Sequence, residues 1–147
     1  MTFRTLLAAG LLLAGCGAIP RDPDGTLERV RAERRFRVGL IAAPADVGGR
    51  RRDAFLRAVG AAAGAAPAVE TGASEPLLDR LEAGELDLVV GELTPKTPWA
   101  KRVTLLPALD EQVGRRGHSH LAAAARNGEN AWIALLHREA TRVAAMP

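Results

Sequence analysis

Apolar side chains recur along residues 26–147 with two different periods, and the period separates predicted helices from predicted strands. Helical spacing of apolar positions predicts four helices, over residues 26–35, 53–64, 74–84 and 129–145. Short runs of apolar and branched residues predict four strands, over residues 36–42, 68–71, 86–91 and 102–106. Residues 118–125 fit either a strand or a helix. Because the strand over 86–91 is apolar at almost every position, we expect it near the centre of a parallel sheet.

Strands and helices alternate along the chain, which is typical of a layered α/β domain. We therefore expect an α/β fold: a single three-layer lobe with a mostly parallel sheet flanked by helices. A chain of 147 residues has room for one such domain. Capping chemistry predicts that Thr26 caps the first helix and that Glu129 and Asn130 cap the last one.

The two tryptophans are expected in different surroundings. Trp132 lies at helical spacing with Leu135 and Leu136, which predicts a place in the core. Trp99 lies in a predicted loop after a proline, so we expect an exposed ring that contacts a ligand or a partner.

Residues 1–16 have the layout of a secretory signal, in which Arg4 precedes a short apolar run, residues 6–13, and small residues follow. The apolar run is too short to span a bilayer as a permanent helix. The segment ends in Leu13-Ala14-Gly15-Cys16, which resembles a bacterial lipobox. In such signals the Cys thiol is acylated, for example with palmitate, and the Cys becomes the mature N-terminus. The alternative is an ordinary signal peptide that ends in a Cys by chance.

The lipobox divides the chain into a signal peptide (1–15), the lipidated Cys16 with its tether (16–25) and a domain (26–147). It implies that membrane lipid is a partner through Cys16 and that the protein lies on the periplasmic side of the cell envelope. Gly17, in place of an Asp, favours the outer membrane in sorting signals of this kind. Because Cys16 is the single cysteine, we expect a domain without disulfides.

Composition and charge exclude several classes of protein. The 48% of hydrophobic and 25% of charged residues exclude a disordered tail and a multi-span membrane protein. The 3% of aromatic residues and the net charge of +3 argue against nucleic acid as a partner. Three consecutive basic residues, Arg50, Arg51 and Arg52, have two interpretations: contact with anionic lipid headgroups near the anchor, or a solvated charge run.

Three stretches, residues 26–39, 77–91 and 93–106, resemble bacterial extracellular solute-binding protein family 3, which has the type-2 periplasmic binding fold. The middle stretch is the most specific, with a helix, Gly84, an acidic residue, Asp87 and an apolar strand in order. The resemblance implies a module that binds a small solute for an ABC-type transporter at the carboxyl edge of its sheet. Family members insert a second lobe after the strand that matches 102–106. Here about forty residues follow that strand, enough to finish one lobe.

The resemblance also implies a ligand site in the loop that follows the strand over 86–91. It assigns ligand contacts to Gly91, Glu92, Thr94 and Trp99. In the family's amino-acid binders, a Thr at the position of Thr94 and an Arg five residues later hold the ligand carboxylate. Trp99 stands at that Arg position, and an indole offers a single neutral N–H donor. The alternative function is a degenerate, non-transporting scaffold or a protein-interaction lipoprotein.

Histidines supply a minor alternative, a metal site. His118 and His120 would share one face of a strand, and His137 could join them from the last helix. Surface histidines near a turn are the other interpretation. The segment 117–121 resembles a serine nucleophile elbow but lacks its second Gly. Because no phosphate loop or dinucleotide fingerprint is present in the sequence, we expect no cofactor and no enzymatic activity.

Overall fold

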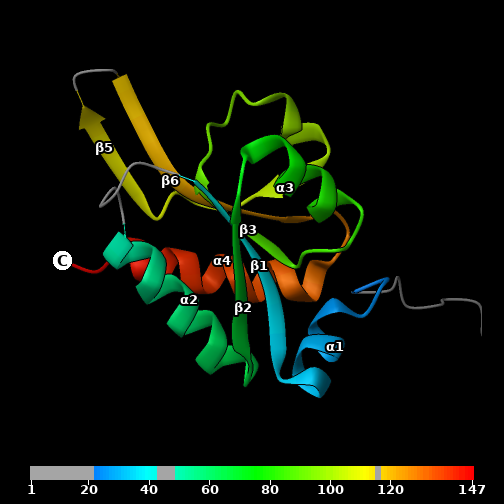
Figure 1. The fold of residues 1–147 in the computed structure, drawn as a ribbon. Helices are drawn as coiled ribbons and strands as arrows, with labels where there is room; N and C mark the ends of the chain where they lie inside the picture. Colours follow the sequence, from blue (N-terminus) through cyan, green and yellow to red (C-terminus); the bar gives the residue numbers. More distant parts are fainter. Residues whose placement is uncertain (1–21, 43–48, 115–116) are drawn as a thin grey trace, which may run out of the picture.

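The computed structural model describes residues 22–42, 49–114 and 117–147, and within 111–119 it describes the backbone alone (Figure 1). The predicted signal peptide, Cys16 and Gly17 lie outside the described residues, as does the side chain of His118. No helix in the described ranges is long and apolar enough to cross a membrane.

The described residues form helices and strands in the predicted alternation. The helices are α1 (Thr26–Glu33), α2 (Gly49–Ala63), α3 (Ser74–Glu82) and α4 (Asn130–Ala144), with a short 3-10 helix, η1 (Pro98–Lys101). The strands are β1 (Arg35–Ile41), β2 (Ala66–Gly72), β3 (Leu88–Glu92), β4 (Val103–Leu105), β5 (Asp110–Gly114) and β6 (Gly117–Arg126). The four predicted helices and four predicted strands are confirmed, and the ambiguous segment 118–125 is a strand. β5 was not predicted from the sequence.

One sheet carries all the strands of the described part, in the order β2-β1-β3-β6-β4, with β5 also beside β6. Parallel pairs join β1 to β2 and to β3, whereas β6 runs antiparallel to β3, β4 and β5. Five of these strands therefore share one direction, and β6 opposes them. The expected mostly parallel sheet is confirmed. We name the edge where β1, β2 and β3 end the carboxyl edge, and the opposite one the amino edge.

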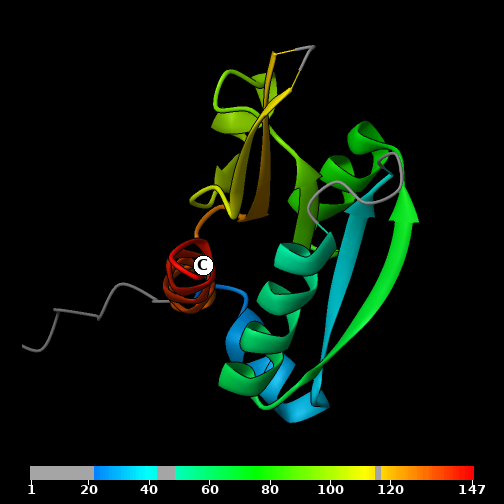
Figure 2. The same ribbon diagram turned by 90° about the vertical axis from the view of Figure 1, so that its left-hand side faces the viewer.

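Helices cover both faces of the sheet, which gives the three expected layers (Figures 1 and 2). One core cluster joins α1, α2 and α4 to the sheet, and the other joins α3 and Trp99 to its opposite face. Trp132 is fully buried, as predicted, and packs edge-to-face on Phe36 with the ring centroids 5.8 Å apart.

The four consecutive alanines of β6 explain why this segment was ambiguous. Ala123 and Ala125 point into the cluster with α1, α2 and α4, whereas Ala122 and Ala124 point into the cluster with α3. Both faces of the strand are thus buried, so its sequence lacks the polar alternation of a half-exposed strand.

The start of α1 is held by a carboxylate from the other end of the chain. The predicted cap was wrong, because Gly25 (φ 64°) takes the N-cap position and Thr26 is the first helical residue. Glu129, 1% exposed, accepts hydrogen bonds from the backbone N–H groups of Asp24 (3.0 Å) and Thr26 (3.1 Å). It makes no side-chain cap on α4, whose first residue is Asn130. Glu129 therefore satisfies free N–H groups of α1 in place of those of its own helix.

Asp22 is the second carboxyl at this junction. Its Oδ2 accepts the N–H of Leu27 at 2.7 Å. Burial, followed by the hydrogen bond with Glu129, raises the pKa of Asp22 to about 6. Burial opposes the charge of Glu129 as well, but hydrogen bonds from Asp22, Thr26 and Asp24 prevail and lower its pKa. The described end of the predicted tether, residues 22–25, is thus fixed to the amino edge of the domain.

Asp87 connects three elements just before β3 begins. Its carboxylate, 2% exposed, accepts hydrogen bonds from Arg29 of α1 (2.5 Å) and from the side chain (2.7 and 3.1 Å) and backbone N–H (2.7 Å) of Arg37 of β1. Its backbone carbonyl accepts the indole N–H of Trp132 at 2.8 Å. Burial alone would raise the pKa of Asp87, but the bonds from Arg37 and Arg29 outweigh it and lower the pKa.

Candidate functional site

The loop after β3 stands at the carboxyl edge, where open α/β sheets place their ligands. Gly91 belongs to β3, just before this loop, and is buried next to Ile41 of β1. A Cβ atom at Gly91 would lie 2.5 Å from the Cβ of Ile41, closer than side-chain atoms approach one another. The structure thus requires glycine at Gly91 for strand packing, and this position offers no side chain to a ligand.

Trp99 is buried, and the expected exposed ring is wrong. Its side chain is 4% exposed and packs in the core cluster with α3. The indole N–H donates to Glu75 Oε2 at 3.1 Å, and the guanidinium of Arg102 lies 4.2 Å from the ring centroid. Arg102 also forms ion pairs with Asp79 and Glu82 of α3. Trp99 therefore packs the loop and η1 against α3. The sequence did not predict this contact, because it predicted a loop where η1 lies.

Glu92 and Thr94 are exposed at the carboxyl edge. The residue between them, Leu93, is buried, and its N–H donates to the carbonyl of His120 at 3.1 Å. A turn follows, in which the N–H of Thr97 donates to the carbonyl of Thr94 at 3.0 Å. Glu92 and Thr94 thus stand on a backbone that is held at both ends, and their side chains remain accessible.

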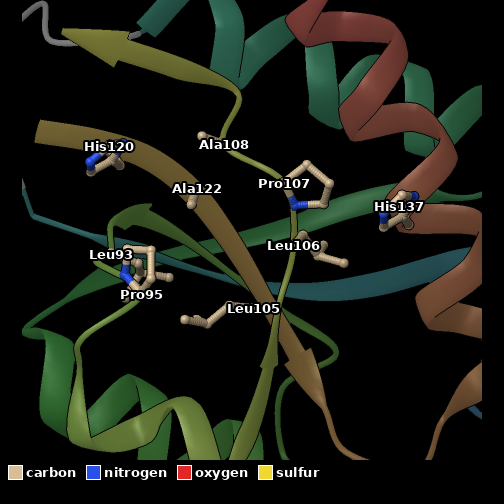
Figure 3. A pocket seen from close by; sticks show the side chains of 9 residues that line it. All are labelled: Leu93, Pro95, Leu105, Leu106, Pro107, Ala108, His120, Ala122 and His137. Carbon is tan, nitrogen blue, oxygen red and sulfur yellow. The ribbon is translucent and has the colours of Figure 1, made fainter.

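A pocket of about 460 Å³ adjoins this loop, where β4 ends and β6 begins (Figure 3). The loop after β3, the segment after β4, β6 and α4 each contribute side chains. Seven of the nine lining residues are apolar, and the two others are histidines. The lining residues are Leu93, Pro95, Leu105, Leu106, Pro107, Ala108, His120, Ala122 and His137.

The predicted ligand residues flank the pocket but do not line it. Leu93 and Pro95 line the pocket, and Thr94 between them does not. Glu92, Gly91 and Trp99 are also outside the lining. The predicted loop adjoins the pocket through Leu93 and Pro95. The segment 105–108 also lines it and was not predicted, because its apolar residues carry no chemical signal.

The predicted metal site includes His118, whose side chain lies outside the described residues. Among the described side chains, no group of three metal-ligating residues occurs. His120 is half-buried and His137 exposed, and both line the pocket from different elements. The structure thus brings two of the three predicted histidines to one cavity of otherwise apolar lining.

The arginine triplet lies at the start of α2, which follows the carboxyl end of β1. Arg51 donates to the carbonyls of Val143 (2.6 Å) and Ala144 (3.2 Å), where it satisfies the end of α4. Arg52 pairs with Asp53 at 2.9 Å. The triplet and the described end of the tether are therefore at opposite edges of the sheet.

The fold is similar to that of solved solute-binding proteins. A mutant of the arginine-bound form of domain 1 from TmArgBP superposes with a TM-score of 0.68, at 13% identity, over 82% of this chain and 99% of that one. An ancestral cationic amino acid solute-binding protein gives 0.62 at 12% identity, over 80% and 93%. A Salmonella typhimurium periplasmic binding protein with high arginine specificity gives 0.59 at 11% identity, over 77% and 94%.

These neighbours show the fold of one lobe of a type-2 periplasmic binding protein. No protein-family model matches the sequence, and no curated protein sequence matches it either. The expected architecture, a single lobe with a mostly parallel sheet between helices, is confirmed.

Proposed function

We propose that this protein is a binding module for a small solute, with its site in the pocket beside the loop after β3. The observation that carries the proposal is the position of the pocket at the carboxyl edge of the sheet. Its volume of about 460 Å³ lies within the range of small-molecule sites, roughly 300–1,000 Å³. The solved neighbours of this fold include arginine-bound and periplasmic binding proteins, which supports the same class of function.

We further propose that Cys16 is lipidated and that the module works on the periplasmic side of the envelope, with Gly17 favouring the outer membrane. The sequence of residues 1–16 supports the anchor. The tether then reaches the domain at its amino edge, next to Glu129, and the pocket opens at the far edge of the sheet. An anchored domain of this shape offers its pocket away from the lipid.

Solute delivery to an ABC-type transporter is the role that fits such a module, and it needs binding without catalysis. Among the described residues that line the pocket, no carboxylate accompanies the two histidines. We therefore propose that the protein is not an enzyme.

A thermal-shift screen of the full chain against amino acids, polyamines, sugars, organic acids and divalent metals tests this function. A ligand at a hundred times its dissociation constant adds about 2.7 kcal/mol, a rise of several degrees in Tm. Ala108→Leu fills the pocket and should abolish the shift. Ala100→Leu, the same change on the exposed surface of η1, should retain it. A shift that survives Ala108→Leu contradicts the assigned site.

The second candidate is a scaffold that binds a protein partner at the carboxyl edge. The observation that favours it is the exposure of Glu92, Thr94 and Lys96 on one short loop beside the pocket. A screen in which no solute raises Tm, together with loss of partner capture in Thr94→Arg, would decide for the scaffold. A solute shift that Ala108→Leu abolishes would decide against it.

A further inference from the structure

The pocket has a lining chemistry that differs from what a cationic solute needs. Its walls are aliphatic side chains, prolines and alanines, and its polar groups are the rings of His120 and His137. No Asp, Glu, Lys or Arg belongs to the lining that the structure describes. A guanidinium or ammonium group placed there would lose water without gaining a carboxylate partner, which is costly.

The imidazole of His137 favours a different head group. Every imidazole carries at least one N–H donor, in its neutral as in its protonated form. A carboxylate accepts such donors, and hydrogen bonds to a charged group are stronger than those between neutral groups. The rest of the lining offers apolar surface, so the remainder of the ligand gains by being apolar.

The arrangement of the rings gives the ligand a direction. Figure 3 shows His137 on the side of Leu106 and Pro107, and His120 on the side of Leu93 and Pro95. His137 is exposed, so a carboxylate beside it keeps part of its hydration while an apolar body extends over the aliphatic wall. His120 then limits the far end of the pocket.

From these contacts, and resting on the proposed function, we propose that the pocket binds a small apolar carboxylate, with His137 as the donor to its head group. The ligand class is thus an organic acid with a short aliphatic or aromatic body. Arginine, to which neighbours of this fold are bound, fits the lining poorly because its side-chain cation finds no carboxylate among the described lining residues.

Probes that share a tail and differ in the head group test the ligand class. The full chain, labelled at its leucine methyl groups, is titrated by NMR with hexanoate, hexylammonium and arginine. We expect hexanoate to shift the methyl resonances of Leu105 and Leu106 and to bind at least about tenfold more tightly than hexylammonium, since only its head group can accept from His137. Equal affinity for the two six-carbon probes, or a preference for arginine, overturns the inference.

Variants of His137 test the head-group contact. His137→Leu should weaken hexanoate binding about tenfold, the value of one hydrogen bond to a charged group. His137→Gln keeps an N–H donor and should weaken binding less than about threefold, with the Tm of both variants unchanged because the side chain is exposed. Equal affinities of the Leu and Gln variants overturn the role of His137.

The failures of the two proposals can be told apart. If another solute binds, Ala108→Leu abolishes its binding and hexanoate causes no shift, the carboxylate inference is overturned and the binding module stands. A flat screen with every probe silent overturns both.

Discussion

Replacement of Asp87 should be the most damaging single change to the charged groups of this fold. The Asp87 carboxylate is 2% exposed and accepts four hydrogen bonds from Arg29 and Arg37. Removal of one partner from a buried ion pair costs about 3–5 kcal/mol. The two arginine side chains are 30% and 33% exposed, so water can recover part of that loss. We expect Asp87→Asn to cost about 2–3 kcal/mol and Asp87→Ala about 3–4 kcal/mol.

The assay is reversible urea unfolding, with Tm as a second readout. At about 4 °C per kcal/mol for a domain of this size, Asp87→Asn should lower Tm by about 10 °C. Glu85→Gln is the matched control, because Glu85 lies two residues away and its pair with Arg80 is exposed. That variant should change stability by less than about 0.5 kcal/mol.

The pH dependence gives an independent check. The pKa of Asp87 is lowered in the folded protein from its ordinary value of 3.8. The stability from its charge is therefore present above pH 4 and is lost as the pH falls through the lowered pKa. The difference between wild type and Asp87→Asn should shrink in that acidic window. Equal effects of Asp87→Asn and Glu85→Gln, or a difference that persists at the lowest pH, would refute the reasoning.

Three further changes test the packing of the two edges. Glu129→Gln should lower the free energy of urea unfolding by about 2 kcal/mol. The amide has one uncharged acceptor oxygen, whereas the N–H groups of Asp24 and Thr26 donate to the two oxygens of the carboxylate. Asp22→Asn should flatten the stability profile between about pH 4 and 6, since a pKa raised from 3.8 to about 6 contributes stability that is present below pH 4 and is lost as the pH rises to 6. Gly91→Ala should lower stability by about 1–3 kcal/mol through its clash with β1, whereas Gly49→Ala, measured in the same way, should not.

The fold could be predicted from the sequence wherever periodicity and burial agree. β3 was recognisable because Leu88, Val89 and Val90 are buried on both faces of the sheet, so each of them is apolar. β5 gave no such signal, because it pairs with β6 alone and its residues 110–114 are mostly polar. A strand that is held by hydrogen bonds to a neighbouring strand's backbone need not have the side-chain pattern of a buried strand.

The loop beside the pocket was predictable from the sequence, whereas most of the residues that line the pocket were not. The loop after β3 follows from the order of the elements, and it does adjoin the pocket. Trp99 was misplaced because its burial depends on packing against α3, where its indole N–H donates to Glu75, a residue 24 positions away in the sequence. Glu129 was expected to cap its own helix for the same reason. The N–H groups that donate to its carboxylate, those of Asp24 and Thr26, lie more than a hundred residues away in the sequence. Long-range polar contacts of this kind have no local pattern.

The buried carboxylates of Asp87 and Glu129 and the apolar pocket lie at opposite edges of the sheet. This separation predicts that stability and binding can be changed independently. Asp87 and Glu129 join elements at the amino edge, and no Asp, Glu, Lys or Arg is among the described residues that line the pocket at the carboxyl edge. One element connects the two: α4 carries Trp132, bonded to the Asp87 carbonyl, and His137.

If α4 is rigid, Asp87→Asn lowers Tm but leaves hexanoate affinity at 20 °C within about twofold. Ala108→Leu then abolishes hexanoate binding and leaves Tm nearly unchanged. The stability effects of the two changes should then add within about 0.5 kcal/mol in the double variant. A larger coupling, with weakened binding in Asp87→Asn, would mean that the amino-edge ion pairs set the position of α4 and, through it, the shape of the pocket.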